Sequence, residues 1–247
     1  MITICHLAAN ELNLNGEKGN LLCIQQRLAW SGIPSEIVEA TSKHSIPRSV
    51  DAVFIGSGTV AGADQALMDL RLHAESLRDL ANSGVPFLAL GLGWEILGQT
   101  IELADGEEVR GLGIFPSSSK RVSHRASCES SGHDNYGVLT TGYANHQSDM
   151  SLFSGAKPLI ELEAGHGNSS TLDYTSVPGE GLLSENLMAA RLNGPLLPMN
   201  PHLADFFIGL MASNSGFKYE QKSAQAQSAD SFAKKAREEL RLRLLRK

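Results

Sequence analysis

The stretch Val85-Pro-Phe-Leu-Ala-Leu-Gly-Leu-Gly-Trp-Glu-Ile-Leu-Gly98 decides the fold. Its apolar first half, 85–90, predicts a short buried strand, and Trp94 to Leu97 open a helix. Several α/β enzymes use such a sharp turn from strand to helix to present a nucleophile above a sheet. The tip of this turn is Gly91, which has no side chain that could attack a substrate. The stretch therefore predicts the scaffold of such an enzyme without its nucleophile.

Strands and helices alternate on the N-terminal side of this stretch. Apolar runs predict strands, and leucines at helical spacing predict amphipathic helices. The predicted strands are 2–7, 35–40, 52–55 and 86–90, and the longest predicted helix is 63–81. This alternation predicts an α/β fold, with a central, mostly parallel sheet and helices on both faces. Ligands of such sheets bind at the carboxyl ends of the strands, so Gly56-Ser57-Gly58 and Gly91-Leu92-Gly93 are expected at one site.

The second half of the chain has a different pattern. Residues 105–185 are rich in Gly, Ser and Asn and lack helical periodicity, which predicts added short β-segments and long loops. A closing helix is predicted over 202–213. The expected organisation is one main domain over 1–213, a polar linker over 214–228 and a basic amphipathic tail over 229–247. Two interpretations of the tail stay open, a solvated, frayed end and a docking helix for a partner or an anionic surface.

Composition excludes several functional classes. The 247 residues are 42% hydrophobic, enough for a substantial core, and the net charge of −6 argues against nucleic acid as a partner. No apolar run is long enough to cross a bilayer, and no signal peptide is visible. Three scattered cysteines, Cys5, Cys23 and Cys128, form neither a disulfide framework nor a metal-binding pattern. We therefore expect a cytoplasmic protein without a metal or cofactor.

The motifs together resemble the class I glutamine amidotransferases, which have a flavodoxin-like fold, in the cobyric-acid-synthase-like branch. Within this branch they are most similar to the GatD family, the glutaminase subunits of lipid II isoglutaminyl synthase. The resemblance covers roughly residues 1–210. It is carried by Asn13-Leu14 with Gly19-Asn20, Phe87 to Gly98, Tyr143-Ala-Asn-His146, Gly165-His-Gly-Asn168 and Leu192-Asn-Gly-Pro-Leu-Leu-Pro-Met-Asn-Pro201 with Leu203-Ala-Asp205. The resemblance implies amidation of the D-glutamate of the peptidoglycan stem, in a heterodimer with a Mur-ligase-like subunit of the MurT type.

The departures from the family pattern fall where its chemistry takes place. The nucleophilic cysteine of the family falls on Gly91, and its catalytic histidine falls on Asn193. Hydrolysis of glutamine needs a thiolate and a base that shuttles the proton. Neither residue can fill these roles. The glycine after the nucleophile is Leu92 here, and the family's glutamine two positions past the second glycine is Glu95.

The remaining candidates concern the binding of a ligand. The resemblance places Gly56, Ser57 and Gly58 at the family's oxyanion loop, where their backbone N–H groups and that of Leu92 could hold a carbonyl oxygen or a small anion. A plain tight turn is the alternative. Arg121 best matches the arginine that holds the carboxylate of glutamine, and Arg125 is the second choice; both could instead be solvated charges.

Other side chains are candidates for groups that could replace the missing nucleophile and base. His146 and His166 could bind a metal or act as a base, although structural histidines are more frequent. Cys128 lies in a polar stretch with no helix start or base nearby, so it is a poor replacement nucleophile. A dinucleotide site fails on spacing, because the glycine that follows Gly93 is Gly98.

Three functional hypotheses follow. The first is a GatD-like subunit that has lost glutamine hydrolysis and acts as a structural or regulatory partner of a Mur-ligase-like subunit, for example one that uses free ammonia. The second is an active glutaminase subunit with relocated catalytic groups. The third is a sensor module that binds glutamine or another amino acid at Arg121 and the backbone donors of Gly56 to Gly58.

Overall fold

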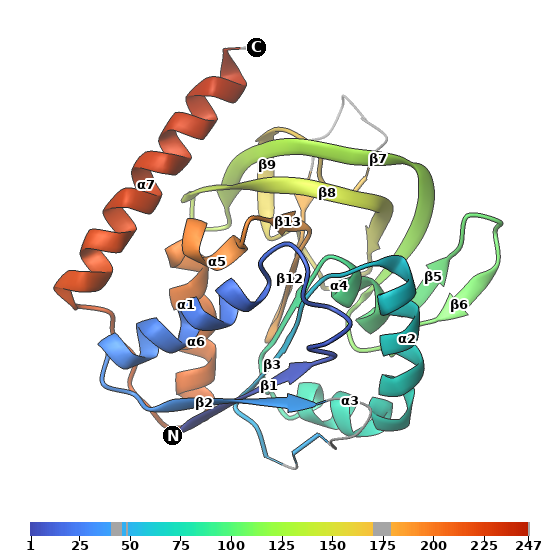
Figure 1. Cartoon of the computed structure of the whole chain (residues 1–247), viewed down its shortest axis with the longest axis horizontal. Helices are drawn as coiled ribbons and strands as arrows, with labels where there is room; N and C mark the ends of the chain where they lie inside the picture. The colour runs from blue at the N-terminus through green and yellow to red at the C-terminus, as the bar shows by residue number, and fades with distance from the viewer. Residues whose placement is uncertain (41–45, 48, 170–178, 247) are drawn as a thin grey trace.

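The main sheet runs through the centre of the molecule (Figure 1). The structure is a computed structural model that describes residues 1–40, 46–47, 49–169 and 179–246. Within them, six strands form this sheet in the order β11-β12-β4-β3-β1-β2. Their bounds are β1 Ile2–Leu7, β2 Ser35–Ala40, β3 Ala52–Ile55, β4 Phe87–Leu90, β11 Leu182–Ser184 and β12 Leu187–Ala190. All neighbours pair in parallel except β11 and β12.

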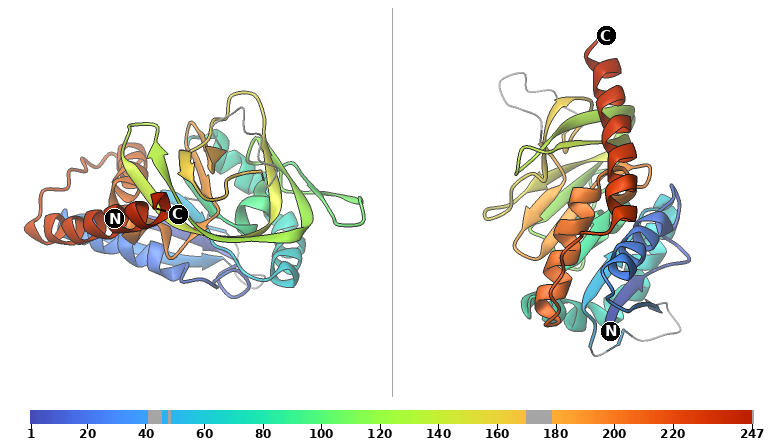
Figure 2. Two further views of the ribbon diagram at one scale, coloured as in Figure 1. Left: turned by 90° about the horizontal axis from the view of Figure 1, so that it is seen from above. Right: turned by 90° about the vertical axis from the view of Figure 1, so that its left-hand side faces the viewer.

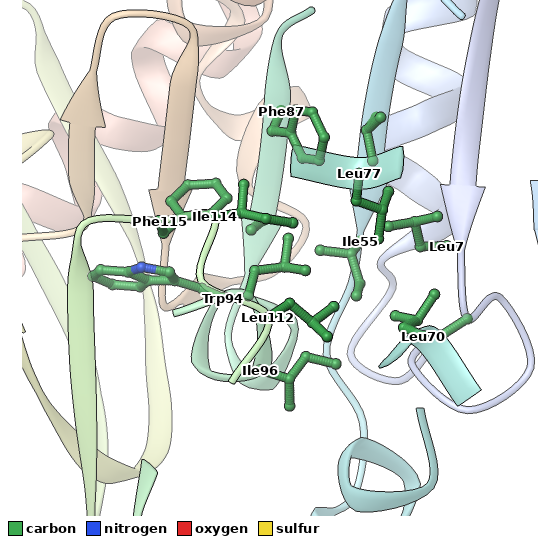
Figure 3. Close-up of a cluster of buried hydrophobic side chains, with 14 of the residues drawn as sticks. Leu7, Ile55, Leu70, Leu77, Phe87, Trp94, Ile96, Leu112, Ile114 and Phe115 are labelled. Carbon is green, nitrogen blue, oxygen red and sulfur yellow. The ribbon is translucent and has the colours of Figure 1, made fainter. Parts of the chain in front are cut away.

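Helices cover both faces of this sheet, because neighbouring residues of each buried strand point to opposite sides. Val53 and Ile55 belong to the core under α2, α3 and α4, and Figure 3 shows Ile55 there, whereas Ala52 and Phe54 pack under α1, α5 and α6. The helices are α1 Lys18–Trp30, α2 Val60–Leu70, α3 Ala74–Asn82, α4 Leu92–Leu97, α5 Leu196–Met199 and α6 Pro201–Asn214. The predicted α/β fold class is confirmed.

The strand predictions agree closely with the structure, but the helix predicted over 63–81 was wrong in two respects, its start and its continuity. It starts earlier, where the Thr59 side chain accepts a hydrogen bond from the Gly62 N–H and caps α2. A 3-10 turn over Arg71–His73 then separates α2 from α3. Leu70 and Leu77 belong to the same core on either side of this turn. Apolar spacing alone does not reveal such an interruption.

A second sheet arches over one end of the first (Figure 1). Its main feature is a long antiparallel hairpin of β7, Ser117–Asp134, and β8, Leu139–Leu152. The other strands are β5 Thr100–Glu102, β6 Glu108–Arg110, β9 Ile160–Ala164, β10 Gly179–Glu180 and β13 Leu192–Asn193. The expectation of only short β-segments was wrong for β7 and β8, because small and polar residues there pair with a partner strand that the sequence pattern does not reveal. Residues 170–178 of this region lie outside the described residues.

The C-terminal tail forms a long helix, α7 Ala224–Leu245, which lies along one side of the molecule (Figure 2). It begins inside the predicted linker, because the Ser223 side chain accepts a hydrogen bond from the Ala226 N–H and caps it. The linker prediction is therefore wrong from residue 224 onward.

Ion pairs hold α7 against the rest of the chain. Asp230 of α7 pairs at 2.7 Å with Arg27 of α1, which also pairs at 2.6 Å with Asp205 of α6. Arg241 of α7 pairs at 2.6 Å with Glu163 of β9. Of the apolar stripe predicted for this helix, Phe232 is 67% exposed. The tail is thus a helix docked on its own chain, rather than a frayed end.

Candidate functional site

The turn after β4 has the backbone geometry of a strained elbow. Gly91 has φ +52° and ψ −120°, a conformation that side chains of L-residues rarely adopt, and α4 begins directly after it. Gly93, two residues later, packs on the backbone carbonyl of Gly56. A Cβ atom on Gly93 would lie only 2.3 Å from that carbonyl oxygen. The elbow and the loop after β3 are therefore in direct backbone contact.

Ser57 fills the space that a side chain at the elbow would need. A Cβ atom on Gly91 would lie 2.4 Å from the Oγ of Ser57 and 2.7 Å from its Cβ. The same Oγ accepts a hydrogen bond of 3.1 Å from the backbone N–H of Leu92. The hydroxyl of Ser57 thus fills the space beside Gly91, and it also accepts the hydrogen bond that the backbone N–H of Leu92 can donate.

A cavity of about 470 Å³ opens beside this elbow. It brings together most of the predicted site residues and several others, namely Leu14, Asn15, Ser57, Gly58, Thr59, Val60, Gly91, Leu92, Glu95, Ala104, Arg121, Val122, Arg125, Asn145, His146, Gln147, Ser148 and Arg191. Gly56 lies behind this lining, in contact with Glu17 and Gly93. A volume of this size is typical of a pocket for a small molecule.

Arg121 lies in the cavity but is held by two carboxylates. Its guanidinium donates to Glu95 at 2.9 Å and to Asp64 at 2.7 Å. Burial raises the pKa of Glu95, and the charge of Arg121 opposes this rise. Nothing in the sequence pattern identified Asp64, because its position on α2 becomes relevant only when that helix packs beside β7. A ligand carboxylate would have to displace one of these partners.

Arg125 is the less constrained of the two candidate arginines. It is exposed, and it donates to the side-chain oxygens of Asn145 at 3.0 Å and Gln147 at 3.3 Å. Both partners are neutral amides on the neighbouring strand β8, so the charge of Arg125 is not neutralised by them.

Asn193 does not belong to the lining of the cavity as described above. Its side chain donates to the backbone oxygens of Tyr143 at 3.3 Å and Arg191 at 3.4 Å. Of the two positions that the resemblance assigns to catalysis, Gly91 contributes to the lining of the cavity and Asn193 does not.

A buried polar cluster that includes Arg191 forms one wall of the cavity. The Arg191 guanidinium donates to the backbone oxygens of Ser148 and Gly167, and the backbone N–H of Arg191 donates to the Glu180 carboxylate at 2.5 Å. Burial lowers the pKa of Arg191 to about 10 and raises that of Glu180 to about 7. Sequence reasoning missed both residues, since an arginine between two apolar strand segments gives no signal of being buried.

The candidate replacement groups His146, His166 and Cys128 lie in surroundings that do not favour catalysis. Burial, with the charge of Arg191, lowers the pKa of His146 to about 3, so its ring is neutral. His166 is held by its backbone N–H, which donates to Ser130 at 3.2 Å. Cys128 is a free thiol on β7, packed against the core under α6 and not part of the cavity lining. In the part of the chain that the structure describes, no three His, Cys, Asp or Glu side chains are placed to hold a metal ion.

Comparison with known proteins identifies the family. Residues 3–200 match the CobB/CobQ-like glutamine amidotransferase domain. This match covers most of the chain, which therefore belongs to that family. Among the described helices, none is long and apolar enough to span a membrane.

Two curated relatives resemble nearly the whole chain. The GatD subunit of the glutamine-hydrolysing lipid II isoglutaminyl synthase of Staphylococcus aureus is 28% identical over 90% of this chain and 88% of its own length. The corresponding subunit of Streptococcus pneumoniae is 28% identical over 82% of this chain and 77% of its own length.

Solved structures share the fold at low sequence identity. A glutamine amidotransferase crystal structure superposes with a TM-score of 0.60 at 16% identity, covering 85% of this chain and 98% of its own. The glutaminase domain of Trypanosoma brucei CTPS, with bound acivicin, gives a TM-score of 0.54 at 13% identity, covering 91% and 98%. The class I glutamine amidotransferase fold predicted from the sequence is thereby confirmed.

Proposed function

We propose that this chain is a GatD-like subunit of a lipid II isoglutaminyl synthase-type complex that does not hydrolyse glutamine. It acts as a structural or regulatory partner of a Mur-ligase-like, MurT-type subunit in the cytoplasm. The likeness to GatD subunits along nearly the whole chain supports the assignment to such a complex. The contact between Ser57, Gly91 and Leu92 supports the loss of hydrolysis.

The physical reason lies in what hydrolysis requires at the elbow. A thiolate must attack the carboxamide, and preorganised N–H donors must stabilise the oxyanion that forms. Here Gly91 has no attacking atom, and the N–H of Leu92 already donates to Ser57. In another nucleophile–base enzyme, loss of the nucleophile alone costs on the order of a millionfold in turnover. The contact of Ser57 with the elbow is the observation that carries the proposal.

A glutamate-release assay tests the loss of hydrolysis. The chain is co-purified with its Mur-ligase-like partner and incubated with glutamine. We expect no glutamate above the level of the partner alone, and amidation of the acceptor with ammonium chloride but not with glutamine. Glutamate release that disappears in Cys128→Ala would contradict the proposal and establish a relocated nucleophile.

A pull-down tests the partnership separately. Tagged full-length chain is expressed in its native host, and the bound proteins are identified by mass spectrometry. We expect a Mur-ligase-like protein in stoichiometric amount. Its absence, with the chain folded and abundant, would contradict the role as a subunit whatever the result of the glutamate assay.

A further inference from the structure

The helix α7 has two faces with different surroundings. The inner face, which carries the buried residues Ala226 and Arg237, docks on the rest of the molecule. The outer face points to solvent, because α7 lies at the edge of the molecule with no other described element outside it (Figure 1). A solvent-facing side of a helix that carries large apolar side chains is suited to packing against another helix.

The outer face of α7 carries a line of exposed side chains, here called the outer stripe. Its members recur at alternating intervals of four and three residues, and they are Ser228, Phe232, Lys235, Glu239, Leu242 and Arg246. Its two apolar members, Phe232 and Leu242, are 67% and 45% exposed. Alternating intervals of four and three residues keep side chains on one face of a helix and form the seam of a coiled coil. The outer stripe therefore has the spacing of a surface that packs against a second helix.

The two charged residues at the centre of the outer stripe are available for a partner. Lys234 and Glu238, which lie beside the stripe, pair with each other at 3.8 Å within the helix. In the part of the chain that the structure describes, no ion pair involves Lys235 or Glu239, and the Lys235 ammonium lies 5.9 Å from the centre of the Phe232 ring. Because these two charges are opposite, the centre of the stripe does not favour a partner of one charge sign, such as nucleic acid or an anionic membrane.

The order of residues makes the outer stripe complementary to itself in the antiparallel direction. When two copies of the helix are placed antiparallel about Arg237, Phe232 of each copy faces Leu242 of the other. In the same register, Lys235 of each copy faces Glu239 of the other. A two-fold axis makes each of these contacts twice, which is the property of an isologous interface.

Other arrangements of the two helices bring unfavourable pairs together. In a parallel pair, each lysine at position 235 meets the same lysine of the other copy, and each glutamate at position 239 meets the same glutamate. A shift of the antiparallel pair by seven residues places Lys235 against Arg246 in one direction and against Phe232 in the other. The charges therefore select one orientation and one register.

We propose that the outer stripe of α7 binds the outer stripe of a second copy of this chain, in an antiparallel and two-fold symmetric helix pair. The contacts between Phe232 and Leu242 bury apolar surface, and the pairs between Lys235 and Glu239 fix the register. Ala236 lies beside the stripe near the two-fold axis, where its small side chain allows close approach of the helices. The inference does not depend on the proposed function, because α7 lies outside residues 3–200 that match the family.

Sedimentation velocity of the full-length chain tests this association. A single helix pair is a small interface, so we expect a weak dimer with a dissociation constant on the order of 100 µM. The sedimentation coefficient is measured between about 5 and about 500 µM, where it should rise from the value of a monomer toward that of a dimer. A chain that stays monomeric over the whole range would overturn the proposal.

Charge reversals locate the contact. Lys235→Glu and Glu239→Lys each place like charges opposite one another twice, so either variant alone should raise the dissociation constant at least about tenfold. An equal mixture of the two variants brings opposite charges together again, and its association should return to within about threefold of the parent. Lys234→Glu makes the same charge change outside the stripe and should alter the dissociation constant less than about twofold.

Three results would overturn the proposal even if the chain dimerises. They are an equal weakening by Lys234→Glu, a dimer that neither reversal weakens, and a mixture that does not associate. Circular dichroism of each variant verifies that α7 is retained, and the concentration series of the unaltered chain needs no variant. A monomeric chain whose two reversals instead reduce the amount of Mur-ligase-like protein in the pull-down would assign the outer stripe to that partner, which also overturns the proposal.

Discussion

The elbow segment, 87–98, and the closing segment, 192–205, both resemble the glutamine amidotransferase family, but their side chains act differently. In the closing segment, the fully buried Asn200 side chain makes hydrogen bonds with backbone groups of Thr141 and Leu196. The segment's own backbone is bound in turn, because the Asn20 side chain accepts a hydrogen bond of 2.8 Å from the Leu197 N–H. In the elbow segment the tip has no side chain, and Ser57 fills the space. The comparison teaches that residues supporting the scaffold can persist where residues doing chemistry are replaced.

The largest expected effect tests the closing segment. Asn200→Ala removes three hydrogen bonds of 2.8–3.0 Å, and the buried N–H and carbonyl groups of Thr141 both lose the side chain that pairs with them. We expect a loss of about 3 kcal/mol in the free energy of unfolding, measured by urea denaturation. Asn193→Ala is the control in the same segment, and it should cost less than about 0.5 kcal/mol because its side chain makes only two long hydrogen bonds. Similar losses in both would contradict this difference.

The second prediction tests the elbow. Gly91→Cys places a Cβ atom against Ser57 at a positive φ, so it should destabilise the protein by about 2 kcal/mol, and the thiol should react slowly with iodoacetamide. Combining it with Ser57→Gly removes the steric conflict and frees the Leu92 N–H. Part of the stability should return and the labelling rate should rise. A stable, fast-labelling Gly91→Cys with Ser57 intact would show that Ser57 does not fill the elbow.

The third prediction concerns the contact of α7 with the closing segment. Arg237 is 7% exposed and donates to the backbone oxygen of Met199 at 2.5 Å. Arg237→Ala should lower the free energy of unfolding by about 1 kcal/mol, whereas Lys235→Ala, at an exposed position of the same helix, should leave it unchanged. Thermal unfolding of both variants checks this, and equal melting temperatures would mean that α7 does not stabilise the segment through Arg237.

The last prediction concerns the buried carboxyl group of Glu17. Its expected effect on the free energy of unfolding is near zero at acid pH and grows as the pH rises. Burial raises the pKa of Glu17, which supports the loop of Gly56 and Ser57, to about 8. The folded state therefore retains a proton that the unfolded chain releases above its ordinary pKa near 4.5. Stability is lost as the pH rises from about 4.5 to about 8.

The comparison of Glu17→Gln with the parent protein measures this loss. The variant should match the parent near pH 4, and its melting temperature should exceed that of the parent increasingly up to about pH 8. A constant difference across this range would contradict the raised pKa.

Local patterns of the sequence were sufficient for the central strands. Alternation of apolar runs with helical spacing placed β1, β2 and β3 at their observed bounds. The same patterns missed the length of β7 and β8, the break between α2 and α3, and the start of α7. Each of these depends on contacts with residues distant in the sequence, which periodicity does not contain.

The sequence by itself determined that Gly91 and Asn193 have no nucleophile or base to offer, because the identity of a side chain decides its chemistry before any folding. It also placed Ser57 and Leu92 together at the carboxyl ends of parallel strands, whereas Arg121 was indicated by the family resemblance. Only the tertiary structure decided that the Ser57 hydroxyl fills the space beside Gly91 and that Asp64 and Glu95 bind Arg121. It also decided that Arg191, which directly follows β12, lines the same cavity. These outcomes follow from packing between separate elements, because contacts between residues far apart in the sequence decide which polar groups are paired.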